Sequence, residues 1–164
     1  MNNKKTYIFL LITIIWSWTF WVLGLNYLTD GINQESIGKF LIFFFTGVYG
    51  PTISGILTTL IFDGLNGVLN LFKKVFIWNI PFKNYLYIIL LPIFFVLIGI
   101  GFYKIFIGDI GSFDIAAFFS IPTVLWAGLY AGPLGEEIGW RGFLLPELQK
   151  KYTNLKSAII IGVI

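Results

Sequence analysis

Four long stretches without a charged residue constrain the fold of this chain more than any other feature. They cover residues 6–29, 40–62, 84–103 and 115–135, which are 24, 23, 20 and 21 residues long. A helix needs about 20 apolar residues to cross the ~30 Å hydrocarbon core of a bilayer. We therefore expect an all-α, polytopic membrane helix bundle with four spans, built as a single membrane domain over residues 1–164.

Composition excludes an ordinary soluble globular protein and several kinds of chemistry. The chain is 57% hydrophobic and 12% charged, whereas soluble domains are about 45–50% apolar and about 25% charged. The net charge is +3, but the basic residues lie between apolar stretches, so we expect a lipid bilayer as partner and no nucleic acid. Cysteine and histidine are both absent from the sequence. This excludes disulfides and removes the commonest general base and metal ligand.

The distribution of Lys and Arg predicts the orientation. Two precede the first stretch, and the four segments that follow the successive stretches contain one, three, one and four. Because basic residues favour the cytoplasmic side, we expect the N-terminus, the segment 63–83 and everything after the fourth stretch to be cytoplasmic. Residues 64–82 mix apolar and basic side chains, which predicts a segment lying along the membrane interface. The ratio of ten Lys to one Arg is typical of an AT-rich genome and favours a bacterial plasma membrane.

Two segments leave their membrane topology open. Residues 157–164 begin like a fifth span but comprise only eight residues, which rise about 12 Å as a helix. We expect them to be the truncated start of a fifth span in a longer protein, with a short re-entrant or interfacial tail as the alternative. Residues 115–131 either cross the membrane or dip into it and return, since both are compatible with the Gly132-Pro133 pair that follows.

Small and hydroxyl-bearing residues within the stretches are expected to serve packing. Gly47, Pro51 and Gly55 recur at helical spacing in the second stretch, and Gly128 and Gly132 in the fourth, as is usual where membrane helices approach closely. Hydroxyl groups such as those of Thr13 and Ser17 are expected to bond within their own helix. None of these residues indicates a particular function.

One ionisable cluster stands out at the cytoplasmic end of the fourth stretch. Residues 132–146 read GPLGEEIGWRGFLLP. The Gly132-Pro133 pair is expected to end the preceding helix, and Pro133 suits the first position of a new one. Ionisable groups in membrane helices are costly, so they tend to face polar cavities and to mark function.

The spacing within this cluster predicts different surroundings for its two carboxylates. Glu137 and Arg141 are four residues apart, which favours an ion pair. Glu136 shares a helix face with Trp140 and Phe143, and this apolar wall together with the charge of Glu137 should raise its pKa. Two carboxylates with separated pKa values are typical of divided roles in acid–base chemistry.

The spacing alone is equally compatible with a solvated helix start and a surface ion pair worth under about 1 kcal/mol. Adjacent carboxylates diverge by about 100° on a helix and cannot readily clasp one metal ion by themselves. Any further catalytic partner is therefore expected to lie outside this chain.

The motif Glu136-Glu137-x-x-x-Arg141, with its flanking Gly-Pro-x-Gly, Trp-Arg-Gly and Leu-Leu-Pro, resembles the CPBP family of intramembrane endopeptidases. This is the CAAX-protease and bacteriocin-processing group, also described as Abi proteins. The four preceding apolar stretches are similar at the level of architecture.

The resemblance implies hydrolysis of a peptide bond in a membrane-associated peptide or protein, near the cytoplasmic membrane face. It implies Glu136 as the water-activating base, with Glu137 and Arg141 organising the site. The family's other motifs carry histidines, which hold a divalent metal such as Zn or complete a glutamate-based site. This chain has neither motif, so we expect the 164 residues alone to be inactive and to bind no metal well.

Two other functions are compatible with the residues. One is a non-catalytic membrane immunity or interaction protein, the role ascribed to some members of the group. The other is a transport or channel subunit, which the absence of charge in the other stretches disfavours.

Overall fold

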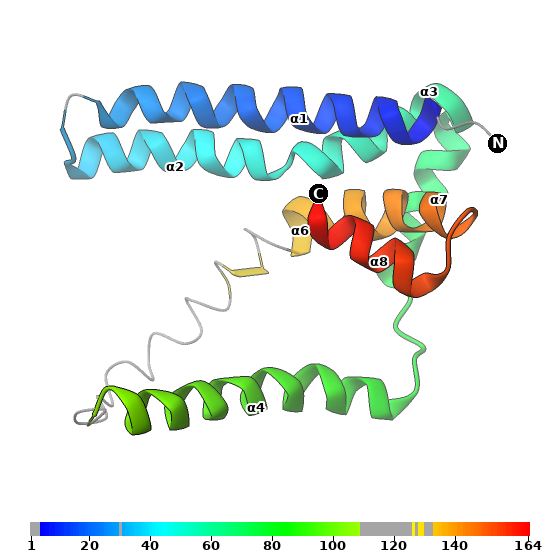
Figure 1. The fold of residues 1–164 in the computed structure, drawn as a ribbon. Helices are drawn as coiled ribbons and strands as arrows, with labels where there is room; N and C mark the ends of the chain where they lie inside the picture. Colours follow the sequence, from blue (N-terminus) through cyan, green and yellow to red (C-terminus); the bar gives the residue numbers. More distant parts are fainter. Residues whose placement is uncertain (1–3, 30, 109–125, 127, 130–132) are drawn as a thin grey trace. The chain divides into compact units, whose positions relative to one another are not determined.

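The computed structural model describes residues 4–29, 31–108, 126, 128–129 and 133–164 (Figure 1). Within these ranges the regular elements are all helices, as the sequence predicts. Most of the fourth stretch, 115–135, lies outside the described residues, so the prediction of a fourth span and the choice between crossing and re-entry remain predictions. The helices are α1 (Lys4–Leu25), η1 (Asn26–Leu28), α2 (Gln34–Val48), α3 (Gly50–Lys73), η2 (Lys74–Phe76), α4 (Phe82–Phe106), α6 (Pro133–Glu137), η3 (Ile138–Leu144), α7 (Leu145–Gln149) and α8 (Asn154–Val163).

Three helical stretches within the described residues are long and apolar enough to cross a membrane. They are Lys4–Leu28, Gln34–Phe76 and Phe82–Phe106. The first covers all but the last residue of the stretch 6–29, and the other two contain the stretches 40–62 and 84–103. The chain forms two compact units, residues 1–76 with 123–164, and residues 77–122. In the second unit, α4 has no buried residue, which fits a helix that is apolar on all sides and faces lipid. The single membrane domain remains a prediction.

In the first unit, α1 and α2 lie side by side as an antiparallel pair (Figure 1). The indole N–H of Trp16 donates to the carbonyl of Thr46 over 3.0 Å, and that of Trp21 donates to Phe44 over 3.2 Å. The Ser17 hydroxyl donates to the carbonyl of Gly47 over 2.8 Å. The expectation that Ser17 bonds within its own helix is therefore wrong, whereas Thr13 does so by donating to Phe9.

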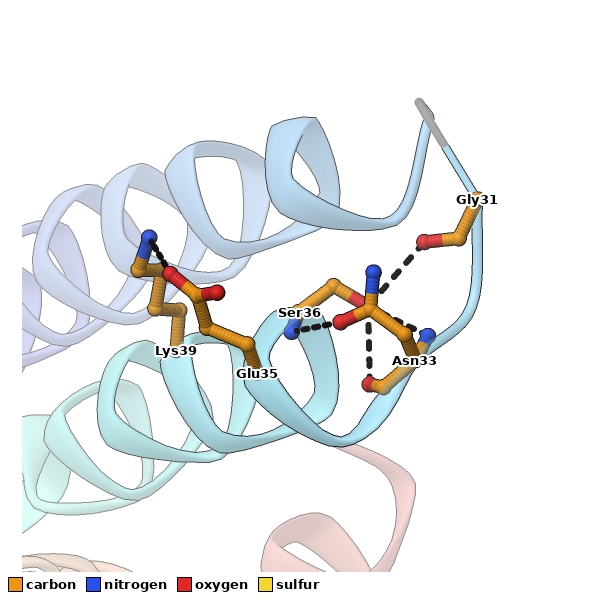
Figure 2. A network of polar contacts seen from close by, with 5 residues as sticks. All are labelled: Gly31, Asn33, Glu35, Ser36 and Lys39. Carbon is orange, nitrogen blue, oxygen red and sulfur yellow. Dashed lines mark hydrogen bonds and ion pairs between the residues drawn. The ribbon is translucent and has the colours of Figure 1, made fainter.

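A capping box starts α2 six residues before the uncharged stretch begins (Figure 2). The Asn33 side chain accepts from the Ser36 N–H, and the Asn33 N–H donates to the Ser36 hydroxyl, both over 2.9 Å. This exchange satisfies backbone donors that a helix start otherwise leaves free. One turn further, Glu35 and Lys39 form an ion pair.

The second stretch is divided between two helices rather than forming one straight span. Proline lacks an N–H, so Pro51 cannot supply the bond that the Gly47 carbonyl would receive inside a continuous helix. Accordingly α2 ends at Val48, and α3 begins at Gly50 with Pro51 in its first turn. The Ser17 hydroxyl bonds to the Gly47 carbonyl instead.

Within α3 the chain bends sharply at Gly64, where φ is +67° (Figure 1). Such a left-handed conformation strongly favours glycine. Gly64 is also where the sequence predicts the interfacial segment to start, and its first part, up to Phe76, is helical. Its position at a membrane interface remains a prediction.

The apolar core of this unit gathers around η3 and α7. Its buried members come from four elements and are Phe9, Leu71, Phe143, Leu144 and Leu148. The small residues of α3 allow the close approach: a Cβ added to Gly55 would lie 3.2 Å from the Cα of Gly139. The prediction that small residues serve packing is confirmed for Gly47, Pro51 and Gly55, since each is buried against a neighbouring helix. It is not borne out for Gly128, where an added Cβ would meet no atom within 4 Å, and Gly132 lies outside the described residues.

Candidate functional site

The segment with the two glutamates begins as predicted and then departs from an ordinary α-helix. Helix α6 starts at Pro133 and carries Glu136 in its first turn. From Ile138 to Leu144 the chain forms a π-helix, η3, and the Leu145 N–H donates to the carbonyl five residues earlier, on Trp140. π-Helical turns are rare overall, and those that occur are often found at functional sites. The sequence reasoning assumed 100° per residue throughout and missed this widening.

Glu136 is half-buried, and its carboxylate has a defined partner. The indole Nε1–H of Trp140 donates to Glu136 Oε2 over 3.3 Å. Burial raises the pKa of Glu136, and the negative charge of Glu137 adds to that rise, while the Trp140 hydrogen bond opposes it. The direction agrees with the prediction from the sequence.

Glu137 and Arg141 form the ion pair that their spacing predicts. Arg141 Nε lies 2.8 Å from Glu137 Oε2, and the two side chains are 74% and 38% exposed. Glu137 Oε2 has no aligned hydrogen-bond donor. The attraction between Glu137 and Arg141 is therefore electrostatic and not a directed hydrogen bond. Glu137 therefore has a cationic partner, whereas the partner of Glu136 is the neutral indole of Trp140.

Glu136 lies at the wall of a cavity of about 140 Å³ in the first unit. A cavity needs about 10–15 Å³ to hold a water molecule, so this one has ample room. The polar side chains in the wall, apart from Glu136, are Thr13, Ser17 and the three indoles. The lining residues are Leu10, Thr13, Ile14, Ser17, Trp18, Trp21, Gly47, Val48, Pro51, Glu136, Trp140 and Ile164.

Phe9 of α1 completes the aromatic wall behind the site. It is fully buried, meeting the Trp140 ring edge-on at 5.4 Å and stacking on Phe143 at 5.1 Å between ring centroids. The sequence reasoning placed Trp140 and Phe143 beside Glu136 but missed Phe9 and the α1 residues of the cavity. No local signal could have found them, because they look like any other member of an apolar span.

The residues present do not by themselves fit a metal site. The described part of the chain contains no group of three or more His, Cys, Asp or Glu side chains that could hold an ion. The whole sequence lacks His and Cys, which are the usual zinc ligands. Glu136 and Glu137 could at most contribute carboxylate oxygens to a site completed by other groups.

Comparison with known proteins bears on this segment. Residues 117–164 match the model of the family described as Type II CAAX prenyl endopeptidase Rce1-like. The matched residues include the Glu136-Glu137-x-x-x-Arg141 motif, and the match confirms the resemblance that the motif carries. No curated protein and no solved structure matches the chain.

Proposed function

We propose that the protein acts as an intramembrane endopeptidase that hydrolyses peptide bonds near the cytoplasmic membrane face, with Glu136 as the base that activates water. The observation that carries the proposal is the position of Glu136: its half-buried carboxylate lines a cavity large enough for water. The family match over residues 117–164 supports the reaction class.

The surroundings of Glu136 suit a general base. Such a base works best when its pKa is near the working pH, and burial moves the pKa of Glu136 upward in that direction. The Trp140 indole fixes the orientation of the carboxylate through its hydrogen bond. Glu137, directly beside the base in the chain, forms an ion pair with Arg141.

Further groups are needed to stabilise the oxyanion that forms during amide hydrolysis. The family resemblance implies imidazoles for this purpose, with or without a divalent metal such as Zn. Since the sequence has no histidine, we propose that these groups come from outside the 164 residues, through further sequence or a partner. On this account the 164 residues alone are inactive.

The test is a cleavage assay on the protein as its gene encodes it, reconstituted in liposomes. The probe is a farnesylated CAAX peptide with a fluorophore–quencher pair, and the variants are Glu136→Gln and the control Glu147→Gln. Glu147 pairs with Lys150 on α7 and lines no part of the cavity. We expect Glu136→Gln to abolish cleavage, by at least about 100-fold for loss of a general base, and Glu147→Gln to retain it.

Undiminished cleavage by Glu136→Gln would show that Glu136 is not the base. If the protein instead protects cells from a bacteriocin and Glu136→Gln retains that protection, the non-catalytic immunity role is the correct one.

A further inference from the structure

The carbonyl of Gly142 lies near the end of η3, at a position where an α-helical hydrogen bond to it is not possible. In an α-helix this oxygen would accept from the N–H of the residue four positions later. That residue is Pro146, which has no N–H. The ammonium of Lys74 supplies a donor from another part of the chain, with Nζ 2.8 Å from the Gly142 oxygen.

A second contact links the same two segments at the same residue. Leu71, three residues before Lys74, is only 4% exposed and belongs to the core around η3. A Cβ added to Gly142 would lie 3.1 Å from Leu71 Cδ1. The Leu71 side chain and the Lys74 ammonium therefore both meet Gly142.

The chain uses the same arrangement once more, at Gly47. There Pro51 removes the α-helical donor, and the Ser17 hydroxyl from α1 bonds to the Gly47 carbonyl over 2.8 Å. In both places a side chain from a distant segment donates to a carbonyl whose α-helical donor would be the N–H that a proline lacks. Each contact ties such a carbonyl to a distant segment; the Ser17–Gly47 contact is buried, whereas the Lys74–Gly142 contact is exposed.

We propose that Lys74 is a positioning residue that fixes the π-helical segment η3, and with it the side chains that surround Glu136. Gly142 directly follows Arg141, the ion-pair partner of Glu137, and lies two residues after Trp140, the hydrogen-bond partner of Glu136. Holding the Gly142 carbonyl therefore restrains both partners. The expected effect on catalysis rests on the proposed function. The structural role of the Lys74–Gly142 contact is independent of it.

The experiment compares Lys74→Met with three other variants of the protein as its gene encodes it. Lys74→Arg keeps a cationic donor. Pro146→Ala combined with Lys74→Met returns a backbone N–H to the Gly142 carbonyl. Lys73→Met removes the adjacent lysine, which makes no hydrogen bond or ion pair with other residues in the described ranges.

Two readouts separate the link from the enzymatic proposal. The first is hydrogen–deuterium exchange of residues 138–145, which needs no activity. The second is kcat and KM for the farnesylated CAAX probe. We expect Lys74→Met to speed exchange and to lower kcat about tenfold with KM unchanged, as for loss of a hydrogen bond to a charged group. Lys74→Arg and the Pro146→Ala combination should restore both to within about twofold of wild type.

The proposal is overturned if Lys74→Met matches Lys73→Met in both exchange and kcat, or if Pro146→Ala fails to suppress its defect. Faster exchange in Lys74→Met that the double variant reverses, in a protein that cleaves no probe, supports the link and counts against the endopeptidase function instead.

Discussion

Glu136 and Glu137 are neighbours in the chain, yet their carboxylates meet different groups. Glu136 accepts from the Trp140 indole at the wall of a cavity. Glu137 faces Arg141, whose side chain is mostly exposed. The helical spacing predicted the Glu137–Arg141 pair and placed Trp140 on the face of Glu136, because each partner lies four positions away; it did not predict the indole hydrogen bond. It could not predict the cavity, because most of its other lining residues come from α1, α2 and α3, at least 85 positions away.

At the residue scale, the Glu137–Arg141 pair should matter little for stability. Both side chains are more than a third exposed, and exposed pairs contribute about 0.2–1 kcal/mol. We expect Arg141→Gln to lower the free energy of unfolding by less than about 1 kcal/mol, so the midpoint of thermal unfolding in detergent should shift by only a few degrees at most. A loss of the folded protein in this variant would show that the pair is structural.

The motif spans α6 and the π-helix η3, and η3 packs against α3. Gly139, in its first turn, lies directly against Pro51. Sequence reasoning predicted the helix start at Pro133 and the small-residue packing face of α3, since both follow from proline and glycine chemistry. It could not predict the π-helix, because hydrophobic spacing over seven residues does not distinguish it from an α-helix.

At the element scale, Gly139→Ala should separate η3 from α3. The added methyl group would overlap the carbonyl carbon and oxygen of Pro51, and backbone atoms cannot move aside as a flexible side chain can. Overpacking of this kind costs about 1–3 kcal/mol or more. We expect Gly139→Ala to lower the midpoint temperature of unfolding by several degrees, measured as loss of the size-exclusion peak after heating.

The matched control for this prediction is Gly162→Ala, because a Cβ added to Gly162 on α8 meets no atom within 4 Å. It should leave the midpoint unchanged or slightly raise it, since alanine favours helix. Equal behaviour of the two variants would contradict the close packing of η3 on α3.

In the first unit as a whole, the segments predicted to be cytoplasmic meet at one end. Lys5 near the N-terminus pairs with Asp63, just before the bend in α3, over 2.6 Å. Beyond the bend, Lys74 reaches Gly142 in the motif segment. These contacts are compatible with the alternation of basic residues, which predicts that the segments share one side of the membrane. The identity of that side remains a prediction.

At the scale of the whole molecule, single-cysteine labelling tests the orientation, and the natural chain has no cysteine to interfere. Asn66, in the exposed part of α3 after the bend, should be labelled by a membrane-impermeant maleimide only in inside-out vesicles as Asn66→Cys. Ile32, 77% exposed between η1 and α2, should be labelled as Ile32→Cys only from the opposite side. The reverse pattern would place the motif outside the cytoplasm.

The central claim, that the Glu136 carboxylate is the base, is tested most directly by changing its pKa without replacing it. The Trp140 hydrogen bond lowers the pKa of Glu136, against the rise caused by burial. Trp140→Phe removes that bond and should raise the pKa further. Since the base acts when ionised, activity appears as pH rises through this pKa, so the acid limb of kcat/KM should move to higher pH.

Trp16→Phe is the matched control, because Trp16 donates to the Thr46 carbonyl and does not line the cavity. The measurement is the pH dependence of kcat/KM for the farnesylated CAAX probe in wild type and both variants. The account predicts an acid limb shifted to higher pH in Trp140→Phe and unshifted in Trp16→Phe. An active Trp140→Phe enzyme with the wild-type acid limb would contradict Glu136 as the base.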